Sequence, residues 1–158
     1  MKLYHGSNVE ISAVDLSKGN KFKDFGRGFY TTHIRQQAVL WSQRIADRFG
    51  GTAVVSEFEF DMEQAVAAGL KVKVFEEPDK EWALFVMANR KQGAEEYKHE
   101  YDIVVGPVAD DRMAQLFGLF EMDIIDLDAV VAGLIYKGLN SQYFFATERA
   151  LNFLKRVL

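Results

Sequence analysis

Three separated segments of the chain combine histidine, glycine, aromatic and amide residues, which are types that suit the binding of a small polar ligand. They cover residues 4–7 (YHGS), residues 24–32 (DFGRGFYTT) and residues 140–144 (NSQYF). An aromatic face stacks on a flat ring, and a glycine backbone allows a ligand to approach closely. The three segments act together only if the fold brings them to one cavity.

Other site types that these residues suggest do not fit their surroundings. Gly26-Arg27-Gly28 begins like a dinucleotide-binding fingerprint, but Thr31 stands where the third glycine belongs, and a strand rather than a helix is expected next. His5 and Ser7 have no nucleophile elbow around them, so a Ser–His nucleophile is not expected. A metal site is not expected either, because the histidines are far apart and no cysteine is present; they are His5, His33 and His99.

The composition is that of an ordinary globular protein. The length of 158 residues suits one domain, expected over residues 1–158, and 49% of the residues are hydrophobic. The formal net charge is -4 and there is no long Lys/Arg run, so a broad nucleic-acid surface is not expected. We interpret a local cluster of basic residues as part of a solvated loop. The cluster consists of Lys18, Lys21, Lys23 and Arg27.

The sequence also indicates a compartment. It has no cysteine, no apolar run of membrane-spanning length and no signal-peptide core at the N-terminus. We therefore expect a cytoplasmic protein that neither contains disulfides nor binds a membrane.

Helices are expected in six places. One helix is expected over residues 34–49, because apolar residues recur there at steps of three and four and Gly50-Gly51 follows. These apolar residues are Ala38, Trp41, Ile45 and Phe49. Asp79 is expected to cap a helix whose inner face is Trp82, Phe85, Val86 and Asn89. Thr147 is expected to cap a last helix that buries Ala150, Leu151 and Leu154. The other helices are expected over residues 61–69, 109–120 and 126–137.

Strands are expected between these helices, without a regular βαβ rhythm. The pattern predicts a mixed α/β (α+β) fold rather than a doubly wound sheet. A Gly-Ser turn should follow the first strand, and a loop should cover residues 8–28. The expected strands cover residues 2–5, 28–32, 52–60, 71–75, 101–105 and 140–146.

Together and in this order, the three polar segments resemble those of ADP-ribosyltransferases of the PARP and diphtheria-toxin-like type. His5-Gly6-Ser7 resembles the His-Gly-Ser/Thr entry of these enzymes, and residues 25–30 resemble their Phe-Gly-X-Gly-hydrophobic-Tyr segment. Gln142 stands where they place a glutamate on a late strand. With residues 102–111 (DIVVGPVADD), the chain is similar to a family of small bacterial proteins assigned to that fold. The resemblance implies a split sheet with flanking helices.

The resemblance also implies that the ligand is NAD, bound as a substrate. Tyr30 would stack on nicotinamide, Gly6 and Ser7 would hold its carboxamide, and His5 would meet a ribose hydroxyl. Gly28 belongs to the same cofactor-binding motif, although Gly26 and Gly28 also suit a tight turn. From charge and proximity alone, Arg27 is expected to meet the pyrophosphate.

Gln142 is the departure from the family pattern. The family glutamate bonds the nicotinamide ribose and stabilises the positive charge that develops on it. Glutamine keeps a hydrogen bond but adds no charge, which by analogy with other preorganised groups costs about 10²–10³ in rate. Another carboxylate would have to compensate. Asp24 and Asp111 are candidates, whereas Glu148 is expected in the first turn of a helix.

The expected catalytic residues are therefore His5, Tyr30 and Gln142. The expected reaction is ADP-ribosyl transfer from NAD to a macromolecular acceptor, with nicotinamide released and no metal required. By resemblance the chain acts as a bacterial toxin or effector, with a small antitoxin-like partner. The alternatives are a catalytically weak or inactive NAD or ADP-ribose binding module, an interaction protein that keeps only the fold, and an NAD glycohydrolase. Trp82 is expected in the core, and Asn89 and Arg90 suit a supporting, capping or surface role.

Overall fold

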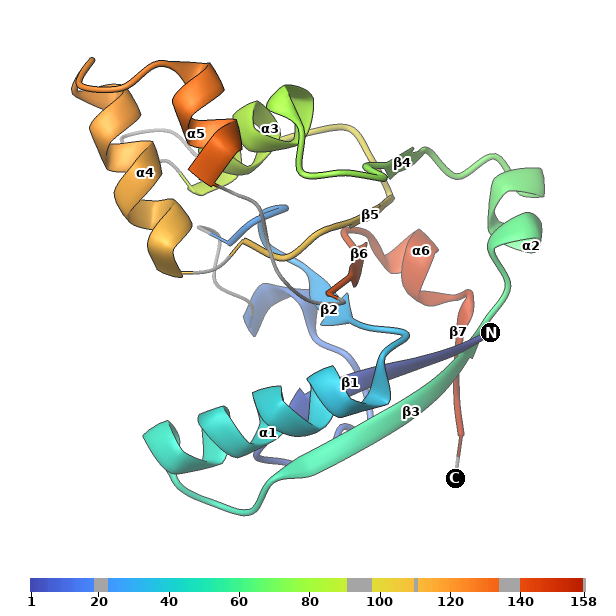
Figure 1. The fold of residues 1–158 in the computed structure, drawn as a ribbon. Coiled ribbons are helices and arrows are strands. Elements are labelled where there is room, and N and C mark those ends of the chain that lie inside the picture. Colours follow the sequence, from blue (N-terminus) through green and yellow to red (C-terminus); the bar gives the residue numbers. More distant parts are fainter. Residues whose placement is uncertain (19–22, 91–97, 110, 134–139, 158) are drawn as a thin grey trace.

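The computed structural model describes residues 1–18, 23–90, 98–109, 111–133 and 140–157 (Figure 1). Its first sheet has the strand order β1-β3-β7 and is antiparallel throughout. The strands are β1 (Lys2–Ser7), β3 (Val54–Phe60) and β7 (Leu154–Arg156). Gly6 pairs with Val55, so the first polar segment lies on this sheet.

A second sheet has the strand order β2-β6-β5-β4. Its strands are β2 (Phe29–Thr31), β6 (Gln142–Phe145), β5 (Ile103–Gly106) and β4 (Val72–Val74). Of these pairs only β4–β5 is parallel. An antiparallel bridge between Tyr4 and Thr32 connects the two sheets. The mixed α+β class expected from the sequence is therefore confirmed.

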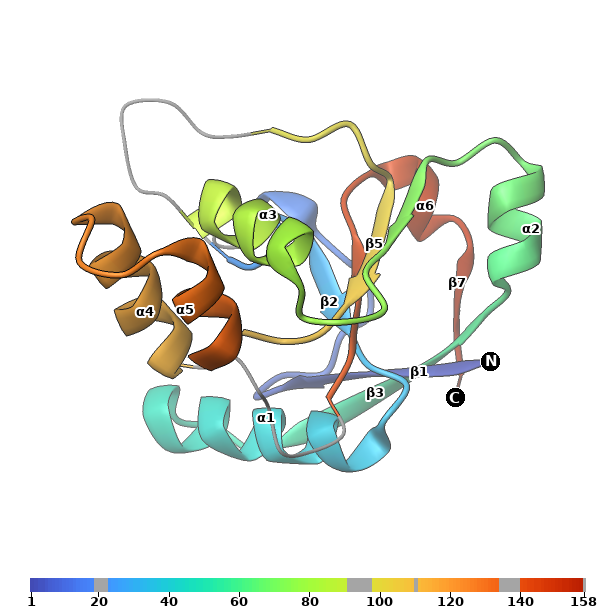
Figure 2. The ribbon, with the colours of Figure 1, turned by 45° about the horizontal axis from the view of Figure 1, so that its top comes forward.

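The longer helices cover the sheets in two places. Helix α1 (Arg35–Phe49) contacts β1 and β3 of the first sheet. Helices α3 (Lys80–Arg90), α4 (Asp111–Glu121) and α5 (Leu127–Gly133) lie together as a second group (Figures 1 and 2). The remaining helices are short: the 3-10 helix Leu16–Lys18, α2 (Met62–Ala67) and α6 (Glu148–Leu151). Within the described ranges, none of the helices has the length and apolar character that a membrane span requires.

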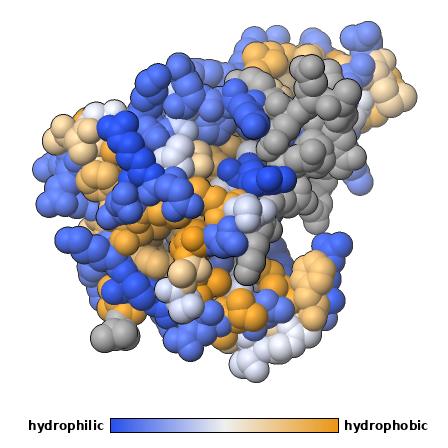
Figure 3. Space-filling model, turned by 180° about the vertical axis from the view of Figure 1, so that it is seen from behind, coloured by the Kyte–Doolittle hydropathy of each residue, from blue (hydrophilic) through white to orange (hydrophobic). Residues whose placement is uncertain are grey.

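Strand alternation on β6 divides the buried residues into two clusters. Phe144 packs with Phe25, Trp82 and Val86, whereas Phe145 packs with residues of the first sheet such as Leu3. Successive side chains of a strand point to opposite faces, so one strand supplies both clusters. Seen from behind, the surface carries apolar atoms in its middle between hydrophilic ones (Figure 3).

Local signals account for several helix boundaries. Gly50 ends α1 with φ 87° and donates its N–H to the Ala46 carbonyl. The expected caps are confirmed, since the Asp79 carboxylate accepts from Trp82 N–H and the Thr147 hydroxyl accepts from Ala150 N–H. On α3, Trp82, Val86 and Asn89 are buried as expected, and Phe85 is half-buried.

Two expectations about the chain ends are wrong. Gly6 and Ser7 continue β1 instead of forming a turn, because all of β1 finds hydrogen-bonding partners on β3. The last helix ends at Leu151, and Leu154 starts β7, which pairs with Phe60 at the free edge of β3. Three residues are too few to show an alternating pattern, so the sequence gives no signal for this strand.

Gly6→Ala is expected to lower the free energy of unfolding by about 1–3 kcal/mol, as other overpacking substitutions do. A Cβ at Gly6 would lie 2.2 Å from the Ala38 carbonyl oxygen and 2.8 Å from the Ser42 nitrogen, so α1 would have to move off β1. Gly118→Ala is the control, because its Cβ would meet nothing within 4 Å. Urea unfolding measures both, and an unchanged Gly6→Ala protein would contradict this packing.

Candidate functional site

A cavity of about 280 Å³ brings together residues from both sheets. His5 and Gly6 reach it from β1, Tyr30 from β2 and Gln142 from β6, so all three polar segments line the same cavity. The remaining lining residues come from α1, from the ends of α3 and β5, and from the segment before β2; they are Lys23, Asp24, Trp41, Ile45, Arg90, Val108 and Ala109.

His5 presents a neutral imidazole to this cavity. Its Nδ1 lies 2.7 Å from the Tyr30 carbonyl oxygen. A carbonyl oxygen only accepts, so Nδ1 carries the proton and Nε2 is left as an acceptor. Burial lowers the pKa of His5, the hydrogen bond to Tyr30 opposes this, and the charge of Lys23 lowers the pKa further. Near neutral pH, Nε2 can therefore accept a hydrogen bond from a ligand hydroxyl.

Tyr30 offers a ring face while its hydroxyl holds the preceding loop. The hydroxyl donates to the Gly26 carbonyl at 2.6 Å and accepts from Phe25 N–H at 3.0 Å. Burial, and after it the charge of Asp24, raises the pKa of Tyr30 well above its usual value, so the phenol stays neutral. The ring lies 4.7 Å from that of Phe144, and the Lys23 ammonium lies 5.2 Å from the Tyr30 centroid. The Tyr30 ring therefore already accepts a cation.

The Asp24 carboxylate is the most heavily bonded group at the cavity, and only 4% of the residue is exposed. Its Oδ1 accepts from Arg90 Nε at 2.6 Å and also pairs with Arg90 Nη2. Its Oδ2 accepts from Ala109 N–H at 2.8 Å and from Gln142 Nε2 at 2.9 Å. The charge of Asp24 is thus balanced by Arg90 within the site.

Gln142 is 3% exposed and is held in one orientation. Its Nε2 donates both to Asp24 and to the Pro107 carbonyl oxygen, the latter at 3.1 Å. Both of these atoms are pure acceptors, so the amide cannot be turned over without losing both bonds. The oxygen, Oε1, has no bonding partner among the described residues and is the atom left for a ligand.

The model of one protein family, described as "Protein of unknown function (DUF3990)", matches residues 1–156. The chain belongs to the DUF3990 family. No match to it is found among curated proteins or among solved structures.

Three of the residues expected at the site do not line the cavity of this DUF3990 protein. Ser7 lies in β1 and its hydroxyl accepts from Val9 N–H. Arg27 lines a different cavity, on the other side of the loop before β2. At Gly28 a Cβ would lie 2.3 Å from the Phe144 ring and 2.5 Å from the Phe145 carbonyl oxygen, so close packing on β6 explains this glycine. Gly6 lines the cavity, but the contact that excludes a side chain there is the one with α1.

The structure describes two of the three carboxylates that were considered as substitutes for the missing glutamate. Asp24 lines the cavity but is already paired. Glu148 is exposed in the first turn of α6, as expected, and does not line the cavity. The Asp111 side chain lies outside the described residues.

Sequence reasoning missed the Asp24–Arg90 pair and the apolar wall that α1 contributes. Arg90 and Asp24 are 66 positions apart and carry no motif, so only the fold reveals them as partners. A usable signal existed on α1, where the expected stripe runs through Trp41 and Ile45. Both line the cavity, whereas Phe49, one step further, is 70% exposed.

Chemically, the cavity of the DUF3990 protein combines a stacking face, two hydrogen-bond acceptors and two cations. The cations are Lys23 and Arg90, of which Arg90 is committed to Asp24. Burial lowers the pKa of Lys23 against the attraction of Asp24. No group of three or more metal-binding side chains is found in the part of the chain that the structure describes. The arrangement suits a polar ligand with a flat ring and hydroxyl groups.

The free energy of unfolding is expected to fall as the pH drops below 6.5, the ordinary histidine pKa. Burial lowers the pKa of both His5 and His99 in the folded state. The unfolded chain then binds more protons than the folded protein below pH 6.5. The stability that depends on neutral His5 and His99 is therefore fully present above that pH and is lost progressively below it. Urea unfolding at pH 7.5, 6.5 and 5.5 measures this dependence.

His99→Gln should weaken this pH dependence, leaving the part due to His5. His33→Gln is the matched control, because it makes the same substitution at an exposed position. An equal slope for His99→Gln and the unsubstituted protein would contradict the assignment.

Proposed function

We propose that this protein binds NAD in the cavity lined by His5, Tyr30 and Gln142 and transfers its ADP-ribose to a macromolecular acceptor, with nicotinamide released. The observation that supports this proposal is the meeting of the three ADP-ribosyltransferase-like segments in one cavity, although they are far apart in sequence. Two of the segments arrive on strands of different sheets, and the third lies beside the second on β6.

Each part of NAD would find a matching group. The nicotinamide ring is flat and positively charged, and it would stack on the Tyr30 face in place of the Lys23 ammonium, which now occupies a cation position there. His5 Nε2 would accept from one ribose hydroxyl. Gln142 Oε1 would accept from a hydroxyl of the ribose that loses nicotinamide, because its amide nitrogen is occupied.

The charge balance favours a second candidate, an NAD or ADP-ribose binding module with little or no transfer. Loss of nicotinamide leaves positive charge on the ribose, and a nearby carboxylate stabilises such a transition state. Among the described lining residues the one carboxylate is Asp24, and it is paired with Arg90. The site then supplies hydrogen-bond acceptors but little net negative charge.

Incubation with NAD labelled on its adenylate portion, together with cell lysate, tests the transfer. We expect label in a macromolecule and release of nicotinamide. Tyr30→Ala should abolish both by removing the stacking face, and Gln142→Ala should abolish both by removing the acceptor. Tyr30→Phe keeps the ring and should retain NAD binding. Gln43→Ala, on the exposed side of α1, is the matched control for Gln142→Ala.

The outcomes separate the two candidates. If no label is transferred and no nicotinamide appears, yet NAD raises the melting temperature in a Tyr30-dependent way, the protein is a binding module. If NAD does not change the melting temperature and no label is transferred to a macromolecule, the site assignment is wrong. Melting curves of each variant without NAD show which of them are folded.

Exchanging the acid and the amide tests whether charge limits the rate. Asp24→Asn combined with Gln142→Glu keeps an amide-to-carboxylate bond between the two positions and moves the carboxylate to position 142. The exchange loses the bonds with Ala109 N–H and the Pro107 carbonyl oxygen, so melting curves must show that the double variant is folded. The double variant should transfer ADP-ribose about 10²-fold faster than the unsubstituted protein, the scale expected for one preorganised electrostatic group. Initial rates of nicotinamide release measure the effect.

Each single variant serves as a control for this exchange. Gln142→Glu alone places two carboxylates side by side and should lower the melting temperature. Asp24→Asn alone adds no charge near the ribose and should not accelerate release. A double variant that binds NAD but is no faster than the unsubstituted protein would refute charge as the limiting factor.

A further inference from the structure

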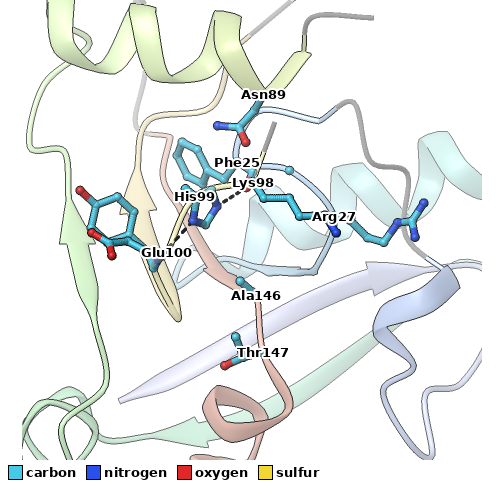
Figure 4. Close-up of a pocket in the computed structure, with 10 residues that line it drawn as sticks. Phe25, Arg27, Asn89, Lys98, His99, Glu100, Ala146 and Thr147 are labelled. Carbon is cyan, nitrogen blue, oxygen red and sulfur yellow. Dashed lines mark hydrogen bonds between the residues drawn. The ribbon is translucent and has the colours of Figure 1, made fainter. Parts of the chain in front are cut away.

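A second cavity of about 280 Å³ lies behind the loop that precedes β2 (Figure 4). Its lining comes from this loop, from the end of α3, from residues 98–101 and from residues 146–147. The two cavities share a wall. Asp24 and Arg90 line the first cavity, whereas their sequence neighbours Phe25 and Asn89 line the second. Ligands can therefore occupy the two cavities separately.

The charged groups at the second cavity are predominantly positive. Arg27 and Lys98 are exposed, and neither has an ion-pair partner among the described residues. Glu100 also lines the cavity, but its carboxylate is paired with Lys71 at 3.0 Å. In Figure 4 Lys98 extends in the direction of Arg27, away from Glu100. A positive patch in a chain of net charge -4 favours an anionic ligand.

A buried acceptor without a partner lies at the same cavity. Asn89 is 3% exposed, and its Nδ2 donates to the Phe85 carbonyl oxygen at 2.8 Å. Its Oδ1 has no hydrogen-bond partner in the described part of the chain. This oxygen lies against Gly26, where an added Cβ would be 3.1 Å away. Buried polar atoms rarely lack a hydrogen-bond partner, so a ligand that donates a hydrogen bond to this oxygen would be stabilised.

The same cavity also offers two uncharged aromatic rings, those of His99 and Tyr101, which are tilted by 36° to each other. His99 Nδ1 accepts from Tyr101 N–H, so Nε2 carries the proton and donates to the Phe25 carbonyl oxygen at 2.8 Å. Both nitrogens are thus occupied, and the His99 ring is fixed next to that of Tyr101, with the centroids 5.6 Å apart. Such a surface suits a planar ring better than a second charge.

We infer that the second cavity binds a small organic phosphate that carries a flat ring with a hydrogen-bond donor, the chemistry of a mononucleotide. The phosphate lies between Arg27 and Lys98, the ring lies along His99 and Tyr101, and the donor satisfies Asn89 Oδ1. The volume fits a small ligand rather than an extended one. A ligand can bind here without NAD in the first cavity.

Calorimetric titration without NAD, using cytidine 5'-monophosphate as the probe, tests the inference. The probe should bind saturably, whereas cytidine and inorganic phosphate should each bind at least about tenfold more weakly, because each lacks one half of the contacts. Equal affinity for inorganic phosphate would overturn the ring contact, and equal affinity for cytidine would overturn the phosphate contact. The absence of saturable binding overturns the site.

Matched variants place the probe in one cavity or the other. Arg27→Gln and Lys98→Gln should each weaken binding about tenfold, the usual scale for losing one charged hydrogen bond. Lys23→Gln removes the same charge from the first cavity and should change the affinity less than about twofold. Ala146→Leu fills the second cavity and should abolish binding without a change in charge. A larger loss for Lys23→Gln than for Arg27→Gln overturns the inference.

Discussion

The arrangement of the first cavity depends on one buried carboxylate, that of Asp24. It receives hydrogen bonds from the end of α3 through Arg90, from the segment after β5 through the Ala109 backbone, and from β6 through Gln142. A buried charge is costly unless it is paired and its remaining lone pairs accept hydrogen bonds, and here both conditions are met. Because each donor belongs to a different element, the bonds that stabilise the carboxylate also fix the cavity walls relative to one another.

The same bonds set what the cavity offers a ligand. Asp24 and Pro107 occupy the amide nitrogen of Gln142, which leaves the amide oxygen as the atom that can accept a hydrogen bond from a ligand. Arg90 cancels the negative charge that a cationic intermediate would need. The site is thus preorganised to accept hydroxyl hydrogen bonds, while its electrostatic contribution to charge development is small. These contacts fit the binding part of the proposal more closely than the transfer part, which needs negative charge at the ribose.

How far the sequence predicts this structure depends on the range of each interaction. Helix ends at Gly50, Asp79 and Thr147 follow from local bonds, and they were predictable. Strand β3 was also predictable, because the alternation of buried and exposed side chains is visible within its own residues. Strand β7 has three residues and exists because the edge of β3 was free to pair, which no local pattern reveals. The meeting of His5, Tyr30 and Gln142 was predictable only by resemblance, and the pairing of Asp24 with Arg90 was not predictable at all. The side of the loop on which Arg27 lies depends on single backbone angles, such as the positive φ of Gly26, which the sequence allows but does not dictate.

That loop also connects the two cavities physically. The Tyr30 hydroxyl bonds both the Phe25 nitrogen and the Gly26 oxygen, and the Tyr30 ring lines the first cavity. On the other side, Asn89 Oδ1 lies against Gly26, and His99 holds the Phe25 carbonyl oxygen. A ligand that reaches Asn89 Oδ1 must therefore press on the same two peptide units that position Tyr30. If it displaces them, its binding energy is coupled to that of any ligand stacked on Tyr30, and the coupling acts equally in both directions. The hydrogen bonds that make the loop rigid are thus also the contacts through which either cavity can influence the other.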